Sequence, residues 1–150
     1  MRRAIQLSIE NVTLRNGGPF GCVVVRDNEI IAEGYNQVTA NNDPTAHAEV
    51  TAIRAACEKL GTFQLDDCII YTSCEPCPMC LGAIYWARPK AVYYANTKKD
   101  AADILFDDDF IYQEIAVGID NRKLPFKQIL NHEALEAFKA WSNKVDKIEY

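Results

Sequence analysis

The sequence predicts an α/β sandwich whose later strands run parallel. Strand-like segments rich in β-branched and aromatic residues occur at residues 21–25, 68–72 and 91–95, and helix-like segments separate them. Strands that alternate with helices in this way are typical of a sheet covered by helices. We expect one domain over residues 1–150, because a chain of this length buries a continuous core without a second domain.

The first elements are expected to be a helix and a β-hairpin. Ile5, Ile9 and Val12 recur at helical spacing, so the chain is predicted to begin with an amphipathic helix that ends at residues 16–18. Residues 21–32 contain two apolar runs around a polar turn, which predicts a hairpin.

A second helix is expected after the hairpin. Residues 37–42 are predicted to form a polar loop, and Asp43-Pro44 has the composition of an N-cap followed by proline in the first helical position. This helix is predicted to run to about Leu60. Residues 68–72 then form a short strand of buried type.

The sequence pattern predicts the elements after residue 80 less and less clearly. Residues 81–86 are predicted to continue a helix, and residues 91–95 to form a further strand. In the last third, residues 110–117 and 126–130 suit either a strand or a helix. Residues 131–143 are expected to be helical.

Composition and charge favour a small substrate over a nucleic acid. The chain has 16 Lys and Arg residues against 21 Asp and Glu residues, a formal net charge of −5, with a local acidic run at residues 107–109. Nucleic-acid-binding proteins usually present a basic surface to the phosphates. No apolar stretch has the length of a signal peptide or a membrane span, so we expect a cytoplasmic protein without a membrane or nucleic-acid partner.

The six cysteines divide into two groups. Three lie in apolar surroundings and are expected to be small buried side chains: Cys22, Cys57 and Cys68. The other three are spaced at intervals of three, which is the spacing of metal ligands and not of a disulfide framework: Cys74, Cys77 and Cys80.

Two short motifs predict a catalytic zinc site. His47, Cys77 and Cys80 supply one nitrogen and two sulfurs, which leaves a tetrahedral zinc ion with an open position for an activated water. Glu49 is expected to move the proton of that water. Pro78 suits an early helical position, which would place both sulfurs in the first turn of a helix.

The spacing of His47 and Glu49 sets a geometric condition. Residues two apart in a regular helix point to nearly opposite sides, about 200° around the axis. Both side chains therefore face the metal only if His47 lies at the irregular start of its helix.

The rival interpretation is a closed zinc site that only stabilises the fold. Cys74 would complete a shell of four ligands with His47, Cys77 and Cys80. A domain of this size does not require such a site, and a closed shell gives Glu49 no role. We therefore favour the catalytic site.

The pattern His-x-Glu…Pro-Cys-x-x-Cys is typical of zinc nucleobase deaminases. The chain resembles, over nearly its whole length, the bacterial guanine deaminases of the cytidine-deaminase-like superfamily. The segments that carry this resemblance are residues 42–50, 72–87, 17–21, 106–108, 110–112 and 149–150. The zinc motifs point to the superfamily, and the Phe-Asp-Asp segment and the C-terminal tyrosine point to guanine deaminase within it.

The resemblance implies a three-layer α/β/α sandwich around a mixed five-stranded sheet, with one Zn²⁺ per chain. It also implies a homodimer that exchanges C-terminal segments, so that Tyr150 closes over the partner's site. The implied reaction is hydrolysis of guanine to xanthine and ammonia. In it Glu49 carries a proton to ring N3 and on to the leaving amine, and Asp108 acts as a second acid.

The resemblance also implies a set of substrate contacts. Asn36 would contact the purine, because its amide is both a donor and an acceptor. The backbone N–H of Ala48 would hold developing charge on the substrate. Phe20 and Trp86 would stack on the base. Taken without the resemblance, Asn36 is better explained as a turn residue, Phe20 and Trp86 as core residues, and Asp108 as a solvated surface charge.

Three alternatives remain open at the level of sequence. A deaminase of adenosine in transfer RNA shares the zinc motifs but needs a basic face. A deaminase of cytosine, cytidine, or another aminopurine or triazine shares them too. The alternative that is no enzyme is a zinc-stabilised binding module.

Overall fold

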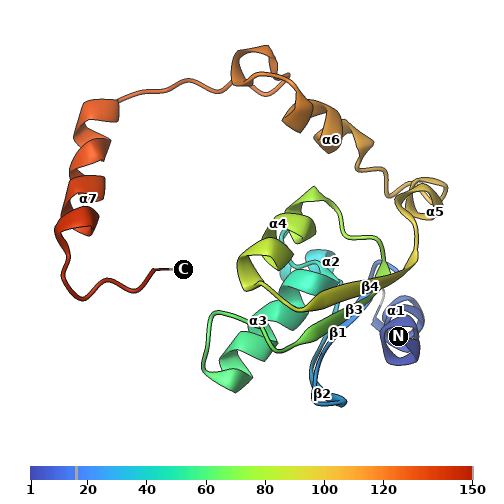
Figure 1. The fold of residues 1–150 in the computed structure, drawn as a ribbon. Coiled ribbons are helices and arrows are strands. Elements are labelled where there is room, and N and C mark those ends of the chain that lie inside the picture. Colours follow the sequence, from blue (N-terminus) through green and yellow to red (C-terminus); the bar gives the residue numbers. More distant parts are fainter. Residues whose placement is uncertain (16, 150) are drawn as a thin grey trace. The chain divides into compact units, whose positions relative to one another are not determined.

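The computed structural model describes residues 1–15 and 17–149. These residues divide into two compact units, Met1–Asp108 and Asp109–Tyr150, and each is described by itself. Both zinc motifs lie in the first unit, whose sheet and helices are drawn from blue to yellow in Figure 1.

A four-stranded mixed sheet forms the centre of the first unit. Its strands are β1 (Gly21–Arg26), β2 (Glu29–Tyr35), β3 (Ile69–Cys74) and β4 (Ala91–Asn96), in the order β2-β1-β3-β4. β1 is antiparallel to both neighbours, whereas β3 and β4 are parallel, as predicted for the later strands. The expected fifth strand is wrong for the described residues, since the chain after β4 forms helices there.

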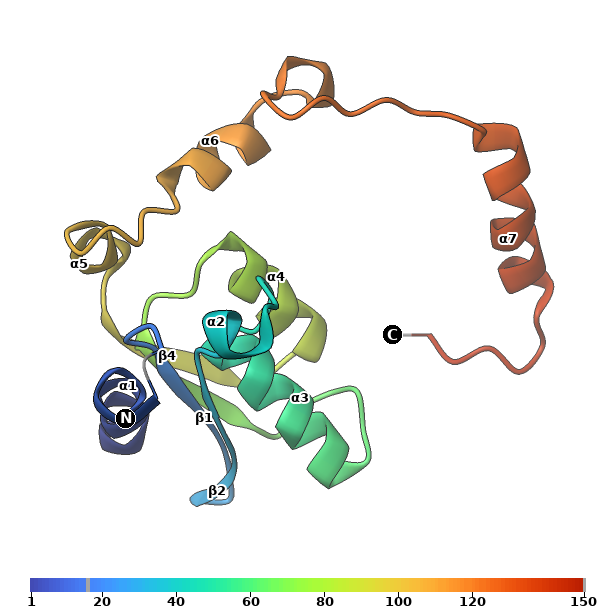
Figure 2. The same cartoon turned by 180° about the vertical axis from the view of Figure 1, so that it is seen from behind.

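Helices cover both faces of this sheet. α1 (Arg2–Arg15) packs on one face, and α3 (Ala48–Leu60) and α4 (Pro78–Ala87) lie on the other (Figures 1 and 2). The three-layer α/β/α sandwich is therefore confirmed. The connection from β3 through α4 to the parallel strand β4 is the crossover that places the cysteine motif at the end of β3.

α1 is helical as predicted, but it turns a different face to the sheet than the isoleucine spacing suggests. Ile5, Ile9 and Val12 are exposed. The buried face consists of small and polar side chains together with Leu7: Ala4, Leu7, Ser8 and Asn11. Gly21 of β1 explains why this face packs on the sheet. A side chain at Gly21 would collide with the backbone of Ala4, so the absence of one lets α1 approach the strand closely.

The hairpin is confirmed, and the loop after it is partly helical. Asp27 and Asn28 both have positive φ (51° and 65°), which is the conformation of a two-residue turn between twisted strands. The predicted loop at residues 37–42 instead contains the short helix α2 (Val38–Asn41), which ends at Asn42 in the left-handed region.

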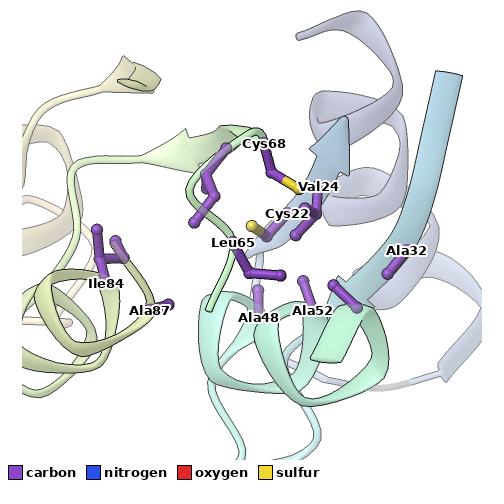
Figure 3. Close-up of a cluster of buried hydrophobic side chains, with 11 residues drawn as sticks. Cys22, Val24, Ala32, Ala48, Ala52, Leu65, Cys68, Ile84 and Ala87 are labelled. Atoms are coloured by element: carbon purple, nitrogen blue, oxygen red, sulfur yellow. The ribbon is translucent and has the colours of Figure 1, made fainter. Parts of the chain in front are cut away.

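The main core lies between the sheet and the layer of α3 and α4 (Figure 3). Cys22 and Cys68 are buried there as small apolar side chains, as predicted, whereas Cys57 is half-buried. Ala48, Ala52 and Ala56 form the face of α3 that meets the sheet. Alanine at these positions allows a short distance between α3 and the sheet. This packing sets how far the first turn of α3 lies from β1 and β2.

Gly34 of β2 is a position where the backbone of α3 comes very close to the sheet. A Cβ there would overlap the carbonyl oxygen of Ala48 and lie 2.6 Å from the nitrogen of Ala52. We expect Gly34→Ala to lower the free energy of unfolding by about 2 kcal/mol, because backbone atoms of a packed helix yield only by moving the whole element. Urea unfolding of the zinc-loaded protein measures the change.

Gly82 is the matched control for this substitution. It lies within α4, and a Cβ there would have no atom within 4 Å. Gly82→Ala should raise stability by about 0.5–1 kcal/mol, because alanine loses less entropy in a helix. If Gly34→Ala had the same free energy of unfolding as the wild type, α3 and the sheet would be able to move apart at no cost, which would contradict this prediction.

The chain beyond β4 is helical. α5 (Lys98–Ala102) was not predicted; Thr97 and Asp100 cap it by exchanging hydrogen bonds, with Thr97 N donating to Asp100 Oδ2 at 2.8 Å. In the second unit, residues 110–117 fall almost wholly within α6 (Asp109–Ala116), and α7 (Asn131–Asn143) confirms the last predicted helix. A short 3₁₀ turn, η1 (Ile119–Asn121), follows α6, and residues 126–130 form neither a strand nor a helix.

None of the helices described combines the length and the apolar character that crossing a bilayer demands.

Candidate active site

His47 is held in an extended conformation immediately before α3. It is the N-cap residue of the helix, with φ −70° and ψ 157°. The predicted helix start at Asp43-Pro44 is wrong: Asp43 Oδ1 accepts from the backbone and hydroxyl of Thr45 (2.8 and 2.7 Å) and closes a separate turn. The helix therefore begins at Ala48, and the condition that allows His47 and Glu49 to face one point is met.

Cys77 and Cys80 lie at the start of α4, directly after β3. Cys77 is the N-cap residue in extended conformation, Pro78 occupies the first helical position as predicted, and Cys80 is the third helical residue. The N–H groups of a first helical turn have no partner within the helix and favour negative charge nearby. The chain thus places two sulfurs where the thiolate form is stabilised.

The three predicted zinc ligands are brought together. His47 Nδ1 lies 3.5 Å from Cys77 Sγ and 3.5 Å from Cys80 Sγ. Bond lengths of about 2.05 Å for Zn–N and 2.3 Å for Zn–S at a tetrahedral angle separate nitrogen from sulfur by roughly 3.6 Å. The donor set and its spacing therefore fit zinc, and the three atoms form the metal-binding cluster found among the described residues.

Cys74 takes no part in this cluster. It is buried at the end of β3, and its Sγ lies 3.6 Å from the carbonyl oxygen of Thr97. The metal-ligand atoms that cluster among the described residues are those of His47, Cys77 and Cys80, without Cys74. The closed site of four ligands is not supported by this geometry.

The protonation of the cysteines follows from their proximity. A hydrogen bond from the Cys80 thiol, aided by His47, lowers the pKa of Cys77 to about 4. The pKa of Cys80 is raised, first because it donates to Cys77 and then because it is buried. Cys77 and Cys80 share one proton, because two thiolates this close would repel each other. A cation bound between them would offset this repulsion, so that both could be thiolates.

Glu49 is buried beside the cluster, with 6% of its surface exposed. Its two oxygens have different partners: Thr72 Oγ1 donates to Oε1 at 2.9 Å, and Cys80 Sγ lies 3.4 Å from Oε2. Burial raises the pKa of the carboxyl. Burial disfavours the charged form of this carboxylate, and it lies next to a metal site. Such a group is suited to accepting and returning a proton.

Asn36 directly follows β2 and is held by contacts with α1 and with the start of α2. Its side-chain Oδ1 accepts from Val38 N at 3.3 Å, and its carbonyl oxygen accepts from Asn11 Nδ2 at 2.8 Å. Asn11 Nδ2 also donates to the carbonyl of Gly18 at 2.7 Å, so one buried amide joins the two segments. The Nδ2 group of Asn36 has no hydrogen-bond partner among the residues described.

Ala48 and Asp108 both lie in the first unit, and their roles toward the substrate stay predictions. Ala48 is fully buried, and as the first residue of α3 its N–H has no acceptor within the helix. In the acidic run Asp108 alone is half-buried, whereas Asp107 and Asp109 are exposed. Burial, followed by the negative charge of Cys77, raises the pKa of Asp108.

The aromatic candidates are less closely tied to the cluster. Phe20 packs partly against the core and edge-on against Phe106, with ring centroids 5.0 Å apart. Trp86 is 64% exposed and lies six residues after Cys80 on α4, roughly 9 Å along the helix axis. Tyr150 lies outside the described residues. Stacking on the base by Phe20 and Trp86, and closure by Tyr150, stay predictions.

Two polar residues of the site were missed at the level of sequence. Thr72 belongs to a strand, where threonine is common. Its closeness in sequence to the cysteine motif, which begins at Pro76, is the one signal that could have pointed to a role in the site. Asn11 is a buried polar residue in the middle of α1, four positions after Leu7 on the same face. A polar residue on the buried face of a helix is a recognisable signal, but the isoleucine spacing pointed to another face.

The fold and the site define a zinc-dependent deaminase: one histidine and two cysteines at two helix starts, an open ligand position and a buried glutamate. Residues 1–96 match the family described as the cytidine and deoxycytidylate deaminase zinc-binding region. The chain belongs to this family and carries its zinc-binding cluster.

Named relatives agree with this assignment over different lengths. The chain is 61% identical over 150 residues to guanine deaminase from Bacillus subtilis (strain 168), covering 100% of this chain and 96% of that protein. An X-ray structure of guanine deaminase from Bacillus subtilis superposes with a TM-score of 0.96 at 62% identity, covering 99% and 95% of the two chains. The tRNA-specific adenosine deaminase of Aquifex aeolicus (strain VF5) is 43% identical over 82 residues, 54% of either chain.

Proposed function

We propose that this protein is a guanine deaminase, which hydrolyses guanine to xanthine and ammonia. The observation that carries the proposal is the extent of the similarity: a guanine deaminase matches 100% of the chain at 61% identity, whereas tRNA-specific adenosine deaminases match 53% to 73% of it at 34% to 45% identity. The net charge of −5 supports a small nucleobase over a nucleic acid as the substrate.

Glu49 is the proton carrier in the proposed reaction. Zinc held by His47, Cys77 and Cys80 would lower the pKa of water and so supply a nucleophile at neutral pH. Glu49 would accept the first proton of the attacking water and deliver it to ring N3 of guanine as the oxygen bonds to C2. Glu49 would then take the second proton from the hydroxyl now on C2 and pass it to the amino group, so that the C–N bond breaks, ammonia leaves and the C2 oxygen becomes the carbonyl of xanthine.

Backbone and amide groups of the first unit orient the base. Asn36 Oδ1 accepts one hydrogen bond, from Val38 N, and the Nδ2 group of this amide is proposed to donate to the purine. The N–H of Ala48, at the positive end of α3, donates to the substrate oxygen or nitrogen on which charge develops. Phe20 and Trp86 are the proposed stacking residues.

Asp108 is the proposed second acid, and its removal tests that role. Asp108→Asn should lower kcat for guanine about 100-fold, because the neutral amide cannot donate a proton to the departing amine. Steady-state kinetics and zinc analysis of the same sample measure the effect. Asp103→Asn, at an exposed position, is the control and should keep the wild-type kcat. A normal kcat with a raised KM for Asp108→Asn would assign Asp108 to binding only.

A homodimer is the proposed assembly, with the C-terminal segment exchanged between protomers and Tyr150 closing the partner's site. Neither α6 nor α7 buries a residue, although the second unit contains large apolar side chains such as Phe110, Phe138 and Trp141. Such side chains are normally covered in a stable protein, and a second copy of the chain supplies the cover. We propose the cytoplasm as the location.

Ammonia release from a panel of substrates tests the proposed function. The zinc-loaded protein is assayed with guanine, guanosine, adenine, cytosine, cytidine and a transfer-RNA stem-loop. Turnover of guanine above the others is the expected result. Preference for another member of the panel would retain the zinc site and overturn the substrate, whereas zinc-loaded protein that turns over none of them would revive the binding module.

A further inference from the structure

Thr72 contacts Glu49 from the central part of the sheet. It lies on β3, with 1% of its surface exposed, and its Oγ1 donates to Glu49 Oε1 at 2.9 Å. Both partners are buried, so water does not compete for this hydrogen bond. The contact joins the sheet to the first turn of α3.

Packing at position 72 does not require the hydroxyl group of Thr72, because valine has the same shape. Thr72 pairs with Cys22, and two residues earlier Ile70 pairs with Val24, so this face of the strands is otherwise apolar. A buried hydroxyl costs free energy unless it is hydrogen-bonded. Among the residues described, Glu49 is the partner that the hydroxyl has.

The second oxygen of Glu49 has no donor of its own, because the one proton of the Cys80 thiol is shared with Cys77. Cys80 Sγ lies 3.4 Å from Oε2, but a zinc-bound cysteine is a thiolate without a proton to donate. The donors that then remain for this carboxylate are the hydroxyl of Thr72 and the backbone N–H of Glu49 itself. Oε1 is fixed toward the sheet, and Oε2 is directed toward the ligands.

We infer that Thr72 is the positioning residue for Glu49: its hydroxyl holds Oε1 so that Oε2 carries the proton during deamination. The inference rests on the proposed function. It assigns different tasks to the two oxygens of one carboxylate, and it predicts that the hydroxyl, not the shape of residue 72, is what catalysis requires.

Thr72→Val is the direct test, because valine keeps the shape and removes the hydroxyl. We expect kcat for guanine to fall about 10- to 100-fold, since a misplaced catalytic group costs a factor of this order. KM should stay within about threefold of wild type, and zinc should remain at one ion per chain, because neither substrate binding nor the ligands are altered. Thr72→Ser, which restores a hydroxyl, should recover most of the lost kcat.

Two controls separate positioning from packing. Ile70→Val removes a methylene from the same face of β3 and should lower the melting temperature while leaving kcat unchanged. In a Glu49→Gln background, Thr72→Val should have little further effect, because residues that act through each other are not additive. A full independent loss in that background would overturn the inference, as would a wild-type kcat for Thr72→Val or a failed rescue by serine.

A structural readout keeps this test separate from that of the proposed function. In crystals of the zinc-loaded Thr72→Val protein, the Glu49 carboxylate should occupy more than one orientation, while the wild-type carboxylate occupies one. If Thr72→Val does not fold, Thr72→Ala is compared with Thr72→Ser in the same way. Wild-type protein that leaves guanine unchanged overturns the proposed function, whereas a single Glu49 orientation in the variant overturns the positioning role.

Discussion

Replacing Glu49 by glutamine is expected to reduce guanine turnover by more than about 100-fold, while zinc and the fold are retained. Glutamine has the same shape and still accepts the hydrogen bond from Thr72, but its amide cannot take up a proton. Because burial raises the pKa of Glu49, the neutral side chain should also leave the melting temperature equal or higher. Xanthine formation, zinc content and thermal unfolding of one preparation measure all three quantities.

Glu58→Gln is the control for this substitution, because Glu58 is exposed on the same helix. It should keep wild-type kcat and zinc content. Near-normal turnover by Glu49→Gln would remove the proton carrier from the proposed mechanism. Loss of zinc from it would mean that the glutamate serves the metal site and not the reaction.

The second large effect is expected at the ligands themselves. Cys80→Ser should weaken zinc binding by more than the roughly 10- to 100-fold that loss of an outer partner costs, since one of three protein ligands is removed. Guanine turnover should fall in proportion to the zinc that remains. Metal analysis after dialysis against a weak chelator, followed by an activity assay, measures both.

Cys74→Ser is the matched comparison, because it makes the same exchange at another buried cysteine near the end of β3. It should retain one zinc ion per chain and wild-type kcat. Equal loss of zinc from both variants would support a closed site of four ligands and contradict the catalytic assignment. Circular dichroism of each variant distinguishes loss of the metal from loss of the fold.

The zinc motifs could be recognised from sequence because metal chemistry restricts both residue type and spacing. His47, Cys77 and Cys80 need only short local segments to be identified, and the order of strands and helices then predicts that these segments meet. The start of α3 was misjudged because Asp43-Pro44 suits a helix start and an isolated turn equally well. The side-chain and backbone hydrogen bonds that decide between the two are visible only in the structure.

Contacts that depend on tertiary packing were harder to foresee. The face of α1 that meets the sheet is chosen by the absence of a side chain at Gly21, and not by the most apolar stripe of the helix. The pairing of Thr72 with Glu49 joins residues 23 apart, on a strand and on a helix whose relative height no periodicity encodes. The sheet has four strands where the resemblance implied five, because the chain that follows β4 is helical.

The contact between Gly34 and the backbone of α3 has a consequence for how related enzymes diverge. It sets His47 and Glu49 in register with the sheet, so the metal chemistry tolerates little change in this region. Phe20, Asn36 and Asp108 are carried by segments at or beyond the strand ends, where substitutions are tolerated more readily than in the sheet. New substrate preferences can therefore evolve in those segments while the hydrolytic centre is inherited unchanged, and directed evolution of this scaffold should target them first.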